Sequence, residues 1–275
     1  MKNIITLILL LFFISCFAQT EDRTKNFPKY LEKVEFMPDR KENLWIFFMA
    51  GQSNMAGRGF VEPQDTISSY RIITINKNNE WVYAKEPLHF YEPNLTNLDS
   101  GLSFGRELSK RLRDSITIAI IPCAVGGSAI KQWLDDDVHR DVKLLSNFKE
   151  KVDLAKQYGT IKGILWHQGE SDAKPSLLPA YKENLPKLFK IFRDYIGNDE
   201  LPIMPANLGL FAPPQEQMKW DAINAVINLL PLNDRYIFPI NSKDLTHKGD
   251  NLHFDSKSQR ELGRRFAEQY IKILK

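Results

Sequence analysis

Cysteine is almost absent from this chain of 275 residues, which holds two, Cys16 and Cys123. Cys16 lies in an N-terminal segment with the features of an export signal, so a processed chain would keep Cys123 alone and could form no internal disulfide. Cys123 ends the apolar run ITIAIIPC at residues 116–123. We therefore expect it to be a buried structural thiol.

An excess of charge of one sign is also lacking. The chain has 37 Lys and Arg against 34 Asp and Glu, a net charge of +3. Loss of residues 1–18, whose one charged residue is Lys2, would leave +2. This balance does not predict a nucleic-acid or membrane-surface partner.

No apolar run is long enough to span a membrane, which takes about 20 residues. The N-terminal run from Ile4 to Phe13 follows Lys2 and precedes small residues near Ala18, the order found in secretory signal peptides. We expect residues 1–18 to be a signal peptide and the protein to be periplasmic or extracellular. Two alternatives are lipidation at Cys16, which would give a surface lipoprotein but which Phe13 fits poorly, and an uncleaved anchor.

What remains has the composition of an ordinary globular protein, 43% hydrophobic and 26% charged. It has no repeat, low-complexity tract or linker. Residues 19–41 are polar and predicted to be an N-terminal lead-in, and residues 42–275 to be one domain.

Short apolar runs alternate with amphipathic stretches along this domain. Strands are predicted at 44–50, 116–122, 161–167, 202–208 and 236–240, and helices at 103–112, 142–158, 177–196, 216–230 and 256–275. This order predicts an α/β fold, a flavodoxin-like three-layer α/β/α sandwich around a five-stranded parallel sheet. Residues 60–100 are predicted to form a long loop region.

Two helices carry finer predictions. Pro179 and Pro186 predict that the helix within 177–196 is irregular or starts later. Ser256 and Gln259 form the capping-box pattern at the start of the last helix. The core-facing residues of that helix are predicted from their four-residue spacing to be Leu262, Phe266 and Tyr270.

Polar clusters follow four of the predicted strands: GQSN at 51–54, CAVGGSAIKQW at 123–133, WHQGESD at 166–172 and DLTHKGDNLHFD at 244–255. In a doubly wound sheet the carboxyl ends of the strands meet at one edge, where ligands bind. We therefore expect one site formed by Ser53, Gly126, Gly127, Gln168, Glu170, Asp250 and His253.

These residue types match the requirements of acyl transfer. A serine such as Ser53 needs an adjacent general base, which His253 supplies, and Asp250 could orient the imidazole. Candidate oxyanion donors are the N–H groups of Ser53 and of Gly127 or Gly126, with the side-chain amide of Gln168. Each residue alone has an ordinary explanation, such as a helix N-cap or a turn. Their occurrence after successive strands favours a serine esterase.

At these residues the sequence resembles the SGNH hydrolase superfamily, and within it the sialate O-acetylesterase-like group that includes the acetyl xylan esterases of carbohydrate esterase family 6. The matching stretches lie within residues 43–272 and are GQSNMAGRG, SGLSFGREL, PCAVGGSAIKQW, WHQGESD and DNLHFD. The resemblance implies a flavodoxin-like fold and deacetylation of sugar esters through an acetyl-serine intermediate, with no metal or cofactor.

Carried over to this chain, the resemblance makes Ser53 the nucleophile, His253 the base and Gly127, or alternatively Gly126, an oxyanion donor. Gln168 stands where many superfamily members have asparagine. The resemblance leaves two candidates for the third catalytic residue: Asp250, which we prefer, and Glu170. If Asp250 orients the imidazole, Glu170 is expected to position His253 or Gln168.

The chain has no room for the inserted β-rich domain of the longer sialate esterases, which favours acetylated polysaccharides or oligosaccharides such as acetyl xylan as substrate. The alternatives are a sialate O-acetylesterase, a lipid or thioester hydrolase, and a sugar-binding protein without activity. The expected substrate contacts are Gln52, Asn54, Arg58 and Trp133, with Phe90 and Tyr91 as further candidates.

Overall fold

The computed structural model describes residues 22–275. The predicted signal peptide and the alternatives at Cys16 lie outside the described residues. The strands are β1 (Leu44–Gly51), β2 (Ile72–Ile75), β3 (Trp81–Tyr83), β4 (Thr117–Pro122), β5 (Val138–His139), β6 (Val142–Lys143), β7 (Thr160–His167) and β8 (Ile203–Pro205). The helices are α1 (Ser53–Ala56), α2 (Gly101–Ser109), α3 (Ile130–Leu134), α4 (Leu144–Tyr158), α5 (Leu178–Ile196), α6 (Pro214–Leu229) and α7 (Ser256–Ile273), with 3₁₀ turns η1 (Lys41–Asn43), η2 (Pro63–Thr66) and η3 (Leu230–Leu232).

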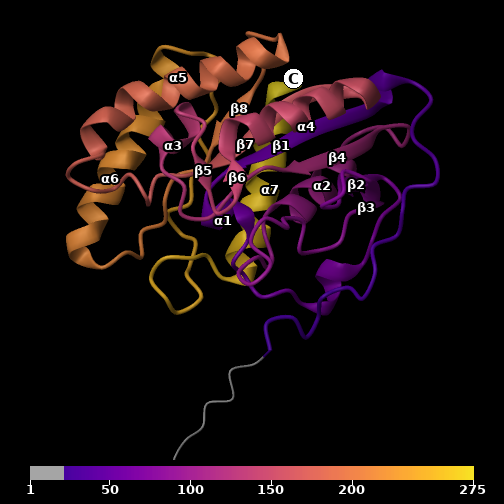
Figure 1. Cartoon of the computed structure of the whole chain (residues 1–275), viewed down its shortest axis with the longest axis horizontal. Coiled ribbons are helices and arrows are strands. Elements are labelled where there is room, and N and C mark those ends of the chain that lie inside the picture. Colours follow the sequence, from indigo (N-terminus) through magenta and orange to yellow (C-terminus); the bar gives the residue numbers. More distant parts are fainter. Residues whose placement is uncertain (1–21) are drawn as a thin grey trace, which may run out of the picture.

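A mostly parallel sheet forms the centre of the fold, in the order β3-β2-β4-β1-β7-β8 (Figure 1). Four of its strands, β1, β4, β7 and β8, were predicted. The fifth predicted segment, 236–240, runs parallel to β8 through isolated bridges at Ile237 and Ile240. The five predicted segments thus lie side by side in the flavodoxin-like order, which confirms the fold class.

The prediction of five strands is wrong, because residues 60–100 are not all loop. They supply β2, which pairs parallel with β4, and β3, which pairs antiparallel with β2. Within the described residues the sheet therefore has six strands. These two strands have four and three residues, too few for a periodic pattern to emerge from the polar sequence around them.

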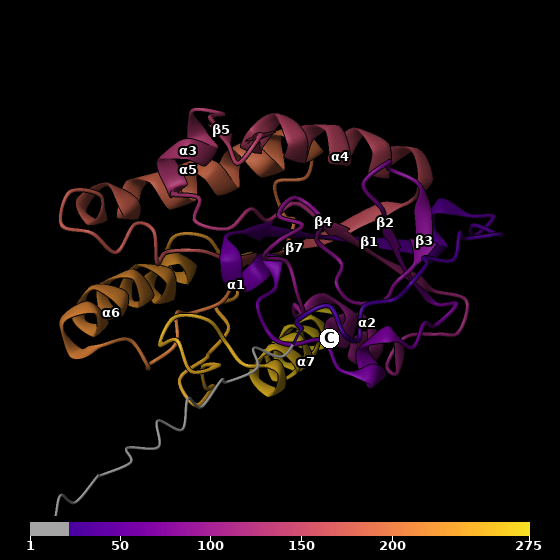
Figure 2. The ribbon, with the colours of Figure 1, turned by 60° about the horizontal axis from the view of Figure 1, so that its bottom comes forward.

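Helices cover both faces of the sheet, as Figure 2 shows with α4 and α5 above it and α2 and α7 below. One apolar cluster fills the space between the sheet and helices α3–α6. A second fills the space between the opposite face of the sheet and helices α2 and α7. Leu262, Phe266 and Tyr270 are buried in the second cluster, as predicted. Cys123 is buried in the first and is a free thiol, also as predicted.

Two local predictions about helices are wrong. Helix α5 runs without a break from Leu178, with Pro179 in its first turn, where a missing N–H costs nothing, and with Pro186 inside it. The residue that caps α7 is Asp255, whose side chain accepts a hydrogen bond from the N–H of Ser258 at 2.8 Å. Ser256 instead donates to the carbonyl of Phe60, and Gln259 to that of Asn54.

The predicted lead-in packs against the domain. Lys33 pairs with Val82 on the outer edge of β3, flanked by backbone hydrogen bonds from Val34 N–H to the carbonyl of Trp81 and from Tyr83 N–H to that of Glu32. The chain therefore covers an otherwise open sheet edge before it enters β1.

Candidate active site

A pocket of about 510 Å³ opens at the carboxyl ends of the parallel strands. Ser53 follows β1, Gly126 and Gly127 follow β4, Glu170 follows β7, and His253 lies in the loop before α7; all of them line this pocket. The strand ends therefore meet as the sequence predicted, and Asp250 lies there too.

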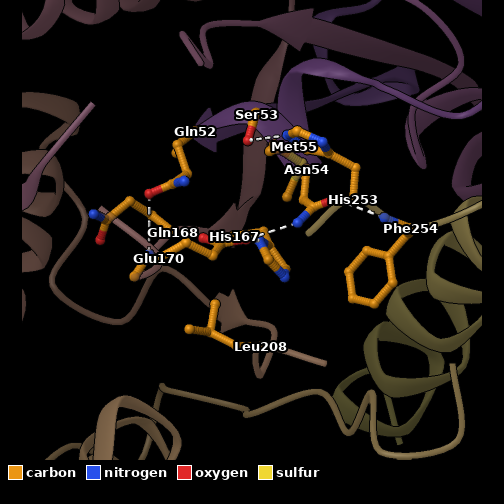
Figure 3. A network of polar contacts seen from close by, with 12 residues as sticks. Gln52, Ser53, Asn54, Met55, His167, Gln168, Glu170, Leu208, His253 and Phe254 are labelled. Atoms are coloured by element: carbon orange, nitrogen blue, oxygen red, sulfur yellow. Dashed lines mark hydrogen bonds and ion pairs between the residues drawn. The ribbon is translucent and has the colours of Figure 1, made fainter. Parts of the chain in front are cut away.

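Ser53 is the first residue of α1, directly after the sharp turn that ends β1. Gly51 makes this turn with φ +132°, and a Cβ added there would lie 2.1 Å from the carbonyl oxygen of His167. The glycine is thus needed both for its backbone angle and for the close approach of β7. The turn leaves Ser53 at the pocket wall, with its side chain aimed at the loop that carries His253 (Figure 3).

Ser53, His253 and Asp250 form a continuous hydrogen-bonded chain. The Oγ of Ser53 lies 3.1 Å from Nε2 of His253, and Nδ1 of His253 lies 2.7 Å from Oδ2 of Asp250. The other oxygen of Asp250 accepts the N–H groups of Leu252 and His253 at 3.0 and 2.8 Å. Because a carboxylate only accepts, the ring proton lies on Nδ1 and the Nε2 lone pair faces the serine hydroxyl.

The surroundings keep this chain of groups in the charge state that a base needs. Burial lowers the pKa of His253, and the hydrogen bond and charge of Asp250 offset only part of that effect. Burial alone would raise the pKa of Asp250, but the hydrogen bonds from His253 outweigh it and hold that pKa below its ordinary value. At neutral pH the imidazole is therefore neutral and the carboxylate ionised.

Glu170 occupies a different place. Its Oε1 accepts a hydrogen bond from Nδ2 of Asn54 at 2.7 Å and lies 3.7 Å from Nδ1 of His167. No hydrogen bond joins it to His253 or Gln168 in the described part of the chain, so any effect on His253 must pass through Asn54. Burial lowers the pKa of His167, which favours the neutral ring beside this carboxylate.

Asn54 connects Glu170 to the histidine loop instead of contacting substrate. Its Nδ2 also donates to the carbonyl of Leu252, and its Oδ1 accepts the N–H of Phe254 at 3.0 Å (Figure 3). The side chain is thus bonded on both sides of His253, and the residue is only 1% exposed. The prediction that Asn54 binds substrate is therefore corrected: it fixes the position of the loop.

Two of the predicted oxyanion donors are already occupied. The N–H of Gly126 donates to Oε2 of Glu92 at 2.6 Å. The amide nitrogen of Gln168 donates to Asp172 and to the carbonyl of Ser128, and its side chain is fully buried. Both predictions are wrong, because these groups cannot reach a substrate in the pocket.

Three other donors belong to residues that line the pocket. The N–H groups of Ser53 and Gly127 have no acceptor among residues 22–275. The oxygen of the Gln52 side chain accepts the N–H groups of Gly169 and Ser171, which leaves its amide nitrogen on the side of Ser53 (Figure 3). Gln52 was predicted as a substrate contact, and its place beside Ser53 suits an oxyanion donor.

Neither Trp133 nor Tyr91 is among the residues that line the catalytic pocket. Trp133 is fully buried, donates to Oγ of Ser128 at 2.9 Å and packs against Trp166. The hydroxyl of Tyr91 donates to the carbonyl of Pro122. The prediction of Trp133 as a sugar contact is therefore wrong: it belongs to the core.

The sequence analysis missed Glu92, which organises one wall of the pocket. Burial would raise its pKa, but the charge and hydrogen bonds of Arg58 outweigh it, so the pKa lies below its ordinary value. This carboxylate binds Arg58 at 2.8 and 2.9 Å, pairs with Arg140 and accepts the Gly126 N–H. Arg58 lines the pocket as predicted. No local pattern in FYEPNLT distinguishes Glu92 from a solvated acid.

Phe60 was missed as well. It lines the pocket mouth with its side chain 50% exposed, and Nζ of Lys248 lies 5.9 Å from the centre of its ring. An exposed aromatic ring next to a polar pocket suits the apolar face of a sugar. Its only sequence signal is a position just after GQSNMAGRG.

Comparison with known proteins agrees with this geometry. Residues 43–272 match the sequence model of a family described as carbohydrate esterase, sialic acid-specific acetylesterase. The chain belongs to this family. It is an esterase, as the sequence predicted, and the resemblance to sialate O-acetylesterase-like SGNH hydrolases is confirmed.

Individual relatives extend along almost the whole domain. The chain is 30% identical over 244 residues to a probable carbohydrate esterase of Arabidopsis thaliana, covering 82% of this chain and 90% of the relative. An Arabidopsis thaliana crystal structure matches at 28% identity with a TM-score of 0.73, covering 84% and 98% of the two chains. NanS matches at 16% identity and TM-score 0.70, covering 87% and 99%, and this likeness shows the fold alone.

Proposed function

We propose that this protein is an exported carbohydrate O-acetylesterase that removes acetyl groups from acetylated polysaccharides or oligosaccharides such as acetyl xylan. The observation that carries the proposal is the Ser53–His253–Asp250 chain of hydrogen bonds at the wall of a polar pocket. Membership of a carbohydrate esterase family supports the sugar ester as substrate.

In this mechanism the Oγ of Ser53 attacks the acetyl carbonyl while Nε2 of His253 takes the hydroxyl proton. The N–H groups of Ser53 and Gly127 and the amide of Gln52 stabilise the oxyanion. His253 then returns the proton to the sugar oxygen as the C–O bond breaks, which leaves acetyl-Ser53. A water molecule, deprotonated by His253, attacks this ester, and acetate leaves as Ser53 regains its proton.

The pocket suits a small acyl group. Of its eighteen lining residues, three have apolar side chains, Phe60, Leu95 and Leu252, and each of them is exposed at the rim. A lipid or thioester hydrolase needs an apolar channel for its acyl chain, which these three residues do not form. O-acetylated sialic acid remains a second candidate substrate, because the family description names it.

The test is ester hydrolysis by residues 19–275, with the variant Ser53→Ala as control. We expect turnover of aryl acetate and of acetylated xylan oligomers, little turnover of aryl octanoate, and a loss on the order of 10⁴-fold or more in Ser53→Ala. Circular dichroism would show that the variant is folded. Substantial activity in folded Ser53→Ala would exclude Ser53 as nucleophile, and faster octanoate cleavage would exclude an acetylesterase.

Export is tested separately, by fractionating cells that make the full chain. We expect mature protein that begins at Gln19 in the periplasm or the medium. Cytoplasmic protein that retains residues 1–18 would overturn this part of the proposal.

A further inference from the structure

A second hollow of about 450 Å³ adjoins the catalytic pocket on the side of strand β6. Consecutive residues form the wall between the two: Arg140 lines the catalytic pocket and Asp141 the second hollow. Tyr91 lines the second hollow, and the next residue, Glu92, binds Arg140. We call this second hollow the lateral groove; a chain of sugars held at Ser53 could continue into it.

A buried lysine lies in the floor of the lateral groove. Lys151 extends from α4 with 6% of its side chain exposed, and its Nζ bonds to one oxygen of Glu150 at 2.9 Å. An ammonium group has three N–H donors, and within residues 22–275 Glu150 takes one of them. The other two donors have no acceptor among the described residues, and a buried donor without an acceptor costs free energy, so the group suits a further anionic oxygen.

The residues that line the two hollows carry an excess of positive charge, the same sign as Lys151. Together the catalytic pocket and the lateral groove are lined by eight Lys or Arg residues and four Asp or Glu residues, whereas the whole chain has 37 and 34. Glu92, buried behind the wall, offsets part of the charge of Arg58 and Arg140. Lys77 and Lys174 form no ion pair within the described chain, which leaves net positive charge in the linings of the two hollows.

A ring pair borders the same groove. Phe90 and Tyr91 lie with their centroids 4.6 Å apart, and the hydroxyl of Tyr91 accepts a hydrogen bond from Nδ2 of Asn147 in the groove wall at 2.9 Å. An aromatic surface next to amide and ammonium donors is suited to a pyranose ring that carries a carboxylate.

We propose that the lateral groove binds the carboxylate of a sugar next to the acetylated one, so that the natural substrate is an acetylated oligosaccharide or polysaccharide containing uronic acids. This inference rests on the proposed acetylesterase activity. It narrows the substrate from acetylated sugar chains in general to acidic ones, because a neutral chain would leave the Lys151 ammonium without an anionic partner other than Glu150.

The first test compares O-acetylated oligogalacturonide trimers with the same trimers after methyl esterification of their carboxylates. We expect kcat/KM to be about tenfold higher for the acidic trimer, and this ratio to fall when NaCl rises from about 50 mM to about 500 mM, since salt screens the attraction. Equal kcat/KM for the two trimers would overturn the inference. So would faster cleavage of O-acetylated sialic acid, a single acidic sugar that has no neighbouring sugar to occupy the groove. Failure to cleave aryl acetate would instead refute the acetylesterase activity.

The second test uses variants of the groove. Lys151→Met keeps the length of the side chain without its charge, and we expect it to reduce the acidic-to-methylated ratio of kcat/KM about fivefold. A double variant, Lys77→Gln with Lys143→Gln, changes two exposed residues of the groove and should reduce the same ratio. It replaces Lys151→Met in the test if that variant does not fold. Lys187→Gln, at a 63% exposed position on α5, is the matched control and should leave the ratio unchanged. Unchanged ratios in the folded groove variants would refute the assignment.

Discussion

Two carboxylates interact with the loop that carries His253, and one of them contacts the imidazole ring of that residue. Asp250 bonds Nδ1 of His253, whereas Glu170 reaches the loop through Asn54. The sequence left the choice open, because both acids follow predicted strands and belong to matching motifs. The two arrangements predict different losses on mutation.

We expect Asp250→Asn to lower kcat by a factor on the order of 10³ to 10⁴, since an amide would hold the wrong imidazole tautomer. Glu170→Gln keeps an oxygen for Asn54 and should cost about tenfold or less. Steady-state kinetics with an aryl acetate measures both. A larger loss in Glu170→Gln than in Asp250→Asn would reverse the assignment.

The acid side of the pH profile reports His253. Only the neutral imidazole accepts the Ser53 proton, so kcat/KM rises with pH through the pKa of His253 in the free enzyme. Because burial lowers this pKa from its ordinary value of 6.5, the midpoint of the rise should lie below pH 6.5. Assays after incubation at each pH and return to pH 7.5 would exclude acid denaturation as the cause. A midpoint above pH 7 would contradict the environment described for His253.

The sequence identified Ser53, His253 and Asp250 correctly as neighbours but misplaced Gln168 and Asn54. A motif shows that a residue follows a strand, but it does not show to which side its side chain points. At the end of a strand successive side chains point to opposite sides. Gln168 turns into the protein toward Asp172, and Gln52 faces the pocket in its place. The orientation of Gln52 depends on its bonds with Gly169 and Ser171, which are more than 100 residues away and which no local pattern contains.

At the scale of elements, α2 and α7 pack so closely that one glycine decides their distance. A Cβ at Gly263 of α7 would lie 2.0 Å from Oγ of Ser103 and 2.3 Å from the carbonyl oxygen of Ser100, both at the start of α2. The second atom is backbone and cannot rotate away. The helices would therefore have to separate.

We expect Gly263→Ala to reduce the free energy of unfolding by about 1–3 kcal/mol, the usual cost of overpacking, although alanine favours helix more than glycine does. Urea unfolding measures it. Lys272→Ala, on the exposed side of the same helix, should change stability by less than about 0.5 kcal/mol. A more stable Gly263→Ala protein would show that the helix contact is looser than described.

Elements were predictable where they are long and buried, and less so where tertiary contacts define them. The eight residues of β1 are almost all apolar, and β7 is nearly as regular. By contrast, β2 and β3 owe their strand geometry to pairing with β4 and with each other. The start of α7 was predicted correctly at Ser256, but its capping residue was not, because Asp255 and Ser256 are both good caps and only the path of the loop selects between them.

At the scale of the whole molecule, the N-terminal segment joins parts that are far apart in sequence. Around Lys33 it pairs with the outer edge of β3, and at Arg23 it donates to the carbonyls of Thr96 and Pro93 while lining the catalytic pocket. Its polar composition predicted an N-terminal lead-in and gave no indication of its contacts. The structure gives it two roles, covering a sheet edge and completing the pocket mouth.

We therefore expect a protein that begins at Lys41 to be less stable and to bind substrate more weakly than one that begins at Gln19. Tm should fall by about 5 °C, because pairing with β3 is lost and the exposed edge can associate with other chains. KM for an acetylated oligosaccharide should rise about threefold as the Arg23 side of the pocket opens. Arg23→Ala in the longer protein separates the two effects: it should raise KM while leaving Tm within about 2 °C of the starting value. If the truncated protein kept both values, residues 22–40 would be a dispensable extension and not part of the domain.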